Sequence, residues 1–169
     1  NFIAKFPQVN LSLLNGNSRE IEAALQEHRI DLGLVEGICR LPNLRYTTFL
    51  QDELVAVVHT GSKLSLPDEI TPEDLSRIPL VLRERGSGTL DVFERALSEH
   101  NMKLSSLNVL LYLGSTESIK LFLEHTDCIG IVSIRSISRE LLSGTFRVIE
   151  IKGMPMLREF CFAQPQGQE

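Results

Sequence analysis

The 169-residue sequence predicts an α/β fold with two lobes. Short apolar segments that suit buried strands alternate with segments of helical spacing, which is typical of α/β units with largely parallel strands. These units fall into two groups, and the stretch from Gly61 to Pro67 interrupts the chain after the last strand of the first group. The interruption favours two lobes over one continuous sheet.

The first group follows a short segment of helical spacing that Pro7 ends. Asn17 and Glu20 have the spacing of a capping box, so a helix is expected to begin at Ser18. A short apolar run before Glu36 and Gly37 suits a strand buried on both faces. The expected elements are a strand at Asn10–Leu14, a helix at Ser18–His28, and strands at Ile30–Val35, Leu44–Leu50 and Glu53–His59.

The second group begins at "TPEDL", where Thr71 is a cap, Pro72 suits the first helical position and Asp74 is the reciprocal acid. Ser115 or Thr116 caps a later helix, because both precede a segment of helical spacing. The expected elements are strands at Pro79–Leu82, Leu107–Leu113, Cys128–Ser133, Thr145–Ile151 and Leu157–Ala163, and helices at Asp91–His100, after Ser115, and at Ser136–Ser143 before Gly144.

Composition and charge narrow the function classes. The net charge of −5 and the pI near 5.4 argue against this chain holding nucleic acid by itself, since phosphate binding normally needs a basic face. Cys39, Cys128 and Cys161 are odd in number and widely spaced, which indicates small buried side chains in a reducing cytoplasm rather than disulfides or a zinc site. No segment suits a membrane span or a signal peptide, and the abrupt N-terminus predicts a fragment of a longer protein.

Three strand exits carry small polar residues. They are Asn15–Ser18, Arg83–Thr89 and Gly114–Ser118. In open α/β sheets, ligands bind beyond the carboxyl ends of the strands, where helix N-termini present unpaired N–H groups. Gly86 and Gly88 would let backbone amides approach a small anion, and the hydroxyl groups add donors. The alternative is that these side chains only cap their helices.

Nucleotide and catalytic motifs do not fit. Gly88 is followed by Thr89 and Leu90, so the lysine of a P-loop is missing, and Asp91 stands where a dinucleotide fingerprint has a small residue. No cofactor or metal is expected. Glu36, at a strand exit, is a base, a ligand contact or merely the ion-pair partner of Arg40. A small α/β enzyme that uses Glu36 or His59 is a rival interpretation, although the sequence shows no oriented pair.

Four stretches, in order, carry a resemblance over nearly the whole chain: "FPQVNLSLLNGNSREIEAALQEHRIDLGLVEG", "DELVAVVHTGSKLS", "PLVLRERGSGTLDVFERAL" and "LGSTESIKLFLEHTDCIGIVS". They resemble the effector-binding domain of LysR-type transcriptional regulators. "RERGSGT" and "LGSTESIK" are similar to the branch with regulators of carbon fixation and of sulfur metabolism.

The resemblance implies a periplasmic-binding-protein-like fold of two Rossmann-like lobes joined by two crossover strands. Lobe I is expected at residues 1–58 plus 160–169, and lobe II at residues 59–159. The family's winged helix-turn-helix, linker helix, first effector-lobe strand and last helix are expected outside this sequence. The ligand contacts carried over from the family are Asn17, Ser18, Ser87, Gly88, Thr89, Ser115 and Thr116, and the positions carried over as hinge or cleft are Glu36, His59 and Thr60.

The sequence therefore predicts a ligand-sensing domain of a bacterial transcription factor and not an enzyme. We expect a small anionic effector, either an oxyanion or a small organic acid, in the cleft between the lobes. We also expect promoter DNA binding through the absent N-terminal domain, a homodimer or homotetramer, no membrane contact and a cytoplasmic location. The alternative is an extracytoplasmic solute-binding protein for a small anion, which would share the architecture.

Overall fold

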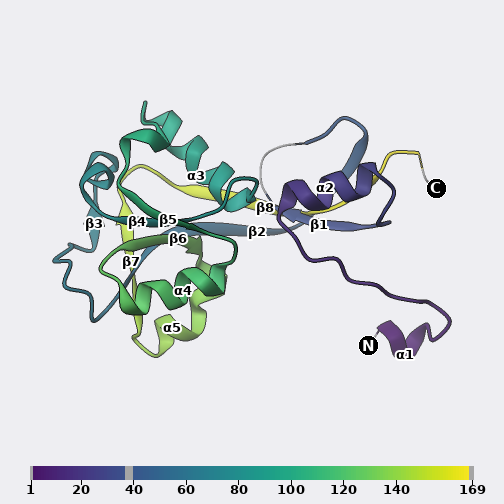
Figure 1. The fold of residues 1–169 in the computed structure, drawn as a ribbon, viewed down its shortest axis with the longest axis horizontal. Coiled ribbons are helices and arrows are strands. Elements are labelled where there is room, and N and C mark those ends of the chain that lie inside the picture. Colours follow the sequence, from purple (N-terminus) through teal and green to yellow (C-terminus); the bar gives the residue numbers. More distant parts are fainter. Residues whose placement is uncertain (1, 37–39, 168–169) are drawn as a thin grey trace.

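The computed structural model describes residues 2–36 and 40–167, which form two lobes (Figure 1). Strands β2 (Leu44–His59) and β8 (Met156–Pro165) run from one lobe into the other. They pair antiparallel with each other from Leu44 to Leu54. The predicted α/β fold with two crossover strands is confirmed.

Lobe I is small and built on antiparallel pairing. Helix α2 (Ser18–Gln26) packs on strand β1 (Gly33–Glu36), which pairs antiparallel with β8. The lobe I core is a cluster of buried side chains from α2, β1, β2 and β8: Ile21, Leu25, Val35, Leu44, Cys161 and Ala163.

Lobe II holds a larger sheet with helices on both faces (Figure 1). Strands β4 (Leu80–Arg83), β5 (Val109–Leu113) and β6 (Ile129–Ser133) pair in parallel, as expected of α/β units. Strand β2 pairs antiparallel with both β6 and β7 (Phe146–Ile151). The parallel pairing predicted for the whole chain is thus found in the centre of lobe II, while lobe I is antiparallel throughout the part that the structure describes.

Two apolar cores cover the faces of the lobe II sheet. Helix α3 (Gly88–Glu99) supplies Phe93 and Leu97 to one core, and α4 (Thr116–His125) supplies Ile119 and Leu123 to the other. Strand β6 is buried along its whole length between them. The remaining elements of the lobe are α5 (Ser138–Leu142), β3 (Glu69–Ile70), and 3-10 helices at Pro72–Arg77, Leu104–Ser106 and Ile134–Ile137.

The predicted starts of α2 and α4 are confirmed by hydrogen bonds, whereas α3 begins at Gly88 and not at Asp91. Asn17 Oδ1 accepts from Glu20 N at 3.0 Å, and Glu20 Oε2 accepts from Asn17 N at 2.8 Å, which completes the capping box. Ser115 Oγ caps α4 by accepting from Ser118 N at 3.1 Å. These contacts satisfy N–H groups that the first helical turn leaves unpaired.

Several predicted strands differ from the structure. The strand predicted at Ile30–Val35 is β1 at Gly33–Glu36, and it is not buried on both faces, because Leu34 is exposed. Residues Asn10–Leu14 form no strand, and Leu11 and Leu13 are exposed. The alternation of apolar and polar residues does not form a strand here, because no neighbouring strand among the described residues pairs with this segment. This segment leads out to α1 (Phe2–Lys5), which lies apart from both lobes (Figure 1). Leu44–Leu50 and Glu53–His59 are one continuous strand with an irregularity at Phe49, because β8 pairs across the polar residues between them.

The predicted lobe boundary at Val58 is too late. Leu54, Ala56 and Val58 pack in one core of lobe II, whereas Leu44 packs in lobe I. The chain therefore changes lobe within β2, before Leu54. Gln51 and Asp52, which separate the two predicted strands, lie within β2, so no turn marks the point at which the chain changes lobe.

The cysteines agree with a structural role where they are described. Cys128 and Cys161 are buried free thiols, and burial raises the pKa of Cys128 to about 11, which keeps that thiol protonated. Cys39, Gly37 and the predicted lobe I ends at residues 1 and 169 lie outside the described residues. Among the described helices, none is both long enough and apolar enough to cross a bilayer.

Candidate functional site

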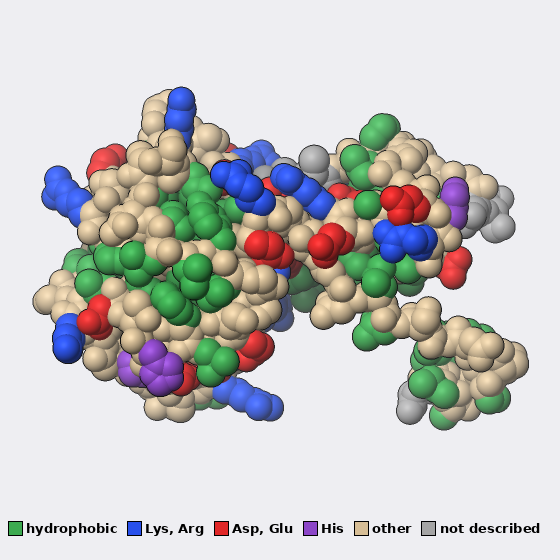
Figure 2. All heavy atoms as spheres, viewed as in Figure 1, with side chains coloured by type: hydrophobic (Ala, Val, Ile, Leu, Met, Phe, Trp, Pro, Cys, Tyr) green, Lys and Arg blue, Asp and Glu red, His purple; other side chains and the backbone are tan. Residues whose placement is uncertain are grey.

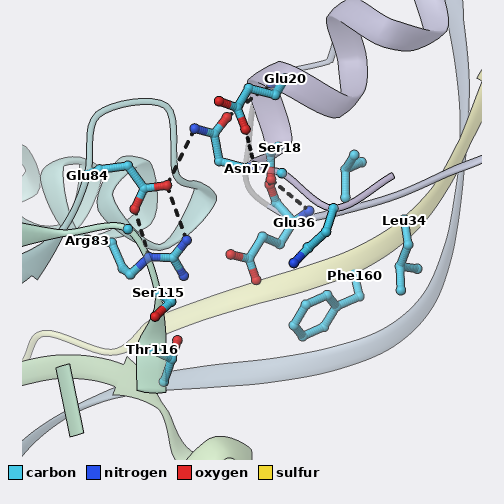
Figure 3. A pocket seen from close by; sticks show the side chains of 14 residues that line it. Asn17, Ser18, Glu20, Leu34, Glu36, Arg83, Glu84, Ser115, Thr116 and Phe160 are labelled. Carbon is cyan, nitrogen blue, oxygen red and sulfur yellow. Dashed lines mark hydrogen bonds and ion pairs between the residues drawn. The ribbon is translucent and has the colours of Figure 1, made fainter. Parts of the chain in front are cut away.

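A cleft of about 590 Å³ opens between the lobes where β1, β4 and β5 end (Figure 3). The N-termini of α2 and α4 face it from opposite lobes. Its wall combines polar side chains with a few apolar ones: Asn15, Gly16, Asn17, Ser18, Glu20, Leu34, Val35, Glu36, Arg83, Glu84, Gly114, Ser115, Thr116 and Phe160. The polar residues 15–18 and 114–116 therefore do converge on one space, although only residues 114–116 follow a strand.

Five of the predicted site residues lie in the wall of this cleft. They are Asn17, Ser18, Glu36, Ser115 and Thr116. Asn17 and Ser115 also cap their helices, so the capping role and the cleft position coexist. Ser18 Oγ donates to the Glu36 carbonyl oxygen at 2.7 Å and ties the start of α2 to the end of β1.

The glycines of the glycine-rich stretch lie where the two lobes touch. Gly86 has φ +94°, which favours glycine, and a Cβ on Gly88 would overlap the Glu36 carbonyl oxygen of lobe I. Ser87 is buried and caps α3 by accepting from Thr89 N at 3.2 Å. Ser87 and Gly88 do not line the cleft, so the expectation that they approach the ligand is not supported by their position.

A buried polar network crosses the junction beside the cleft. Arg158, on β8, donates from Nε to Asp52 Oδ2 at 2.8 Å, and its Nη1 forms an ion pair with Glu36 Oε2 at 2.6 Å. Thr89 Oγ1 accepts from Arg158 Nη1 at 2.9 Å and donates to Glu36 Oε1 at 3.3 Å. Ser133 Oγ donates to Asp52 Oδ1 at 2.9 Å. The network thus links lobe I, both crossover strands and lobe II.

A second cavity of about 380 Å³ adjoins this network. Glu36, Arg83, Thr116 and Phe160 line both this cavity and the cleft, so the two spaces meet at these four residues. The Arg158 guanidinium lies 4.8 Å from the centre of the Phe160 ring, in reach of a cation–π interaction.

Sequence reasoning missed Arg158 and Asp52. They are 106 positions apart and meet only because β2 pairs with β8. The local sequence does not mark them as buried, because Asp52 lies between Gln51 and Glu53, and Arg158 is followed by Glu159. Charged residues in such polar surroundings are mostly exposed, and they are rarely buried unless they are paired.

Arg83 is the basic side chain of the cleft wall. Its Nε donates to Glu84 Oε2 at 2.9 Å, and Asn17 Nδ2 of lobe I donates to Glu84 Oε1 at 3.4 Å (Figure 3). Burial by itself raises the pKa of Glu84, but the hydrogen bonds from Arg83 and Asn17 outweigh it, so the net pKa lies below the ordinary value of 4.5. Glu84 is therefore ionised at neutral pH and balances Arg83.

The charges around the cleft are paired. Figure 3 shows the Glu36 carboxylate projecting into the space between Arg83 and Phe160. Arg158 is paired with Glu36 and Asp52, and Arg135 lies 3.7 Å from Asp52. Across the junction, Arg19 of lobe I pairs with Asp91 of lobe II at 3.3 Å. Figure 2 shows this mixture of basic and acidic side chains where the lobes meet.

Three predictions about Glu36, His59 and Thr60 need correction. Glu36 pairs with Arg158 and not with Arg40, which pairs with Glu159. His59 ends β2 beside Phe146, and Thr60 Oγ1 donates to the Gly144 carbonyl, so both lie at the far end of lobe II from the cleft. The hinge prediction for these two residues is wrong because β2 passes the junction before Leu54.

The structure offers no support for the rival enzyme. Its candidate bases lie far apart. Glu36 lies at the cleft between the lobes, and His59 lies at the far end of lobe II. Over residues 2–36 and 40–167, His, Cys, Asp and Glu side chains form no group of three or more placed to hold a metal ion.

The fold and the cleft define a two-lobed domain for binding small molecules. The chain belongs to the LysR substrate binding domain family, whose match extends over residues 1–169. It is accordingly a ligand-sensing regulatory domain of the LysR type, and the solute-binding alternative is not favoured.

Similar proteins agree with this assignment. The uncharacterized HTH-type transcriptional regulator YeiE of Escherichia coli (strain K12) is 33% identical over 146 residues, which are 86% of this chain and 48% of that protein. The RuBisCO operon transcriptional regulator of Acidithiobacillus ferrooxidans is 27% identical over 167 residues, or 99% of this chain and 53% of that protein. The chain thus spans about half the length of these curated relatives.

A solved structure extends the similarity to the whole fold. The CcmR regulatory domain of Synechocystis PCC6803, in complex with 2-PG, has a TM-score of 0.84 and 26% identity. The similarity covers 99% of this chain and 79% of that one.

Proposed function

We propose that the cleft between the lobes binds a small anionic effector, either an oxyanion or a small organic acid. The observation that carries the proposal is the meeting of two helix N-termini and Arg83 around one space of about 590 Å³. Helix N-termini and arginine both favour negative charge. Asn17, Ser18, Ser115 and Thr116 supply further donors in the wall, and Thr89 supplies one beside the adjoining cavity.

Isothermal titration with sulfate, inorganic phosphate and malonate tests this proposal. Arg83→Gln removes a charge-assisted contact, so the affinity for the bound anion is expected to fall about tenfold or more. Arg147→Gln is the matched control, because Arg147 pairs with Asp68 of lobe II and lies outside the cleft. Equal affinities in the wild type, Arg83→Gln and Arg147→Gln would contradict the site.

For the full-length protein we infer a cytoplasmic transcriptional regulator that is not an enzyme. The net charge of −5 disfavours DNA binding by this chain. Promoter DNA is therefore contacted through a separate N-terminal domain, in agreement with the description of the relative YeiE as an HTH-type regulator. The effector acts by its differential affinity for two arrangements of the lobes.

We further infer a homodimer or homotetramer. Strand β5 is the edge of the lobe II sheet and exposes Leu110, Leu111 and Tyr112, and Leu121 of α4 is also exposed. An apolar patch lies over this part of lobe II (Figure 2). Such a patch suits a second copy of the chain. Leu111→Asp is expected to lower the mass measured by light scattering, and an unchanged mass would exclude this surface.

A further inference from the structure

The Glu36 carboxylate is held by groups that suit an anionic ligand. Arg158 forms an ion pair with one of its oxygens at 2.6 Å, and Thr89 donates to the other at 3.3 Å. The side chain borders both the cleft and the adjoining cavity. We propose that Glu36 is an internal substitute for the effector's anionic group, and that the effector binds by displacing this carboxylate from Arg158. This inference rests on the proposed binding of an anion.

Charge balance at Arg158 favours exchange over simple addition. The Arg158 side chain is only 4% exposed and already contacts two carboxylates, those of Glu36 and Asp52. A third negative group at the same guanidinium would be repelled by both, while loss of Glu36 without replacement would leave a buried charge under-compensated. Replacing one carboxylate by a ligand anion avoids both costs.

Glu36 is the carboxylate that can leave. The Asp52 side chain is fully buried and also accepts from Ser133. The Glu36 side chain is 19% exposed and faces the open cleft (Figure 3). Its backbone is fixed, because Ser18 Oγ accepts from Glu36 N at 3.2 Å and donates to Glu36 O at 2.7 Å. Displacement therefore needs only rotation of the side chain.

The exchange changes how the lobes are connected. Glu36 ends β1 of lobe I, and Thr89 lies in the first turn of α3 of lobe II. When the ligand takes the place of Glu36 on Arg158 and Thr89, one polar tie between the lobes is lost, while the Arg19–Asp91 pair remains. The ligand thereby biases the arrangement of the lobes through the contact it replaces.

The test compares Glu36→Gln with Glu159→Gln. Glu159 is a matched control, since it also pairs with an arginine, Arg40 at 3.3 Å, and accepts from a threonine, Thr48 at 2.9 Å, outside the cleft. Titration with sulfate, inorganic phosphate and malonate is expected to show about tenfold tighter binding to Glu36→Gln than to the wild type, because the neutral glutamine no longer competes with the anion for Arg158. Glu159→Gln is expected to stay within about twofold of the wild type.

Thermal unfolding without ligand gives a second readout. Glu36→Gln is expected to melt below the wild type although it binds the anion more tightly, a combination that a purely structural role does not produce. Glu36→Asp, whose shorter side chain weakens the contact with Arg158, is expected to show intermediate affinity and keeps the test available if Glu36→Gln does not fold.

The outcomes separate the two proposals. If the wild type binds an anion and Glu36→Gln binds it equally or more weakly, displacement is wrong while anion sensing stands. If no variant, Glu36→Gln included, binds any of the three anions, both proposals fail.

Discussion

The two lobes differ in how they are stabilised. Lobe II has apolar cores on both faces of its sheet, with Phe93 fully buried on one face and Ile119 on the other. Lobe I has one small core under α2 and exposes Leu32 and Leu34 around β1. Because buried apolar area supplies most of the favourable free energy of folding, lobe II is the more stable unit.

The difference shows what the crossover strands do. Strand β2 begins in lobe I and strand β8 ends there, and the other half of each strand is anchored in lobe II. Lobe I therefore depends on lobe II through these strands and through the polar network at Arg158. A lobe with a lower local stability can respond to a ligand more easily than the lobe that anchors it.

The largest effect is expected from Phe93→Ala in lobe II. Removal of this fully buried ring is expected to cost about 3–5 kcal/mol in the free energy of unfolding, measured by urea denaturation. Phe49→Ala, at a ring that is 46% exposed, is the control and should cost much less. Similar costs for both variants would contradict the view that lobe II carries the main core.

Leu25→Ala in lobe I is expected to have a smaller and more local effect. Leu25 is fully buried, so the cost is about 2–3 kcal/mol, near the low end for Leu→Ala because the small core can collapse. Hydrogen exchange should accelerate in α2 and β1 while β4 and β6 keep their protection. Leu11→Ala, at an exposed side chain, is the control. Uniform acceleration in both lobes would show that they unfold as one unit.

Gly88→Ala tests the contact between the lobes. The added Cβ would overlap the Glu36 carbonyl oxygen, so the lobes must separate locally, at a cost of about 1–3 kcal/mol. Gly114→Ala is the control, because a Cβ there meets nothing within 4 Å. If thermal melting shows equal stability for the two variants, the close approach at Gly88 does not contribute to stability.

The smallest effects are expected from two glutamates that titrate in opposite directions. In lobe I, burial raises the pKa of Glu22 above its ordinary value of 4.5, despite the hydrogen bond from Tyr46. The folded state therefore disfavours ionised Glu22, and this loss of stability develops as pH rises through the folded-state pKa. Glu22→Gln should be more stable than the wild type at pH 7, by less than about 1 kcal/mol, and the gain should disappear below pH 4.5.

In lobe II the sign is reversed. The hydrogen bond from Lys120 lowers the pKa of Glu140 below its ordinary value of 4.5. Ionised Glu140 therefore stabilises the folded state at pH values above 4.5, and this stability is lost as pH falls through the folded-state pKa. Glu140→Gln should lower stability at pH 7 by about 0.2–1 kcal/mol and have no effect at low pH. Unfolding curves at several pH values measure both variants, and equal signs at pH 7 would contradict the assignment.

The sequence by itself determined the starts of α2 and α4 and the succession of strands and helices along the chain in lobe II. Capping pairs such as Asn17 and Glu20 act over three residues, and buried strands such as β6 show as short apolar runs, so both are readable without the fold. It also indicated that polar residues precede the helices that Asn17 and Ser115 cap, and the structure brings these two residues to one cleft.

Only the tertiary structure decided which polar groups meet at the junction. Arg158, Asp52 and Glu36 come from three strands far apart in the sequence, and their pairing depends on the register of β2, β8 and β1. The same holds for Gly88, whose small size allows the close approach of the Glu36 backbone in lobe I. Local hydrogen bonding and periodicity act within a few residues, whereas long-range strand register and lobe contact place side chains that share no local pattern.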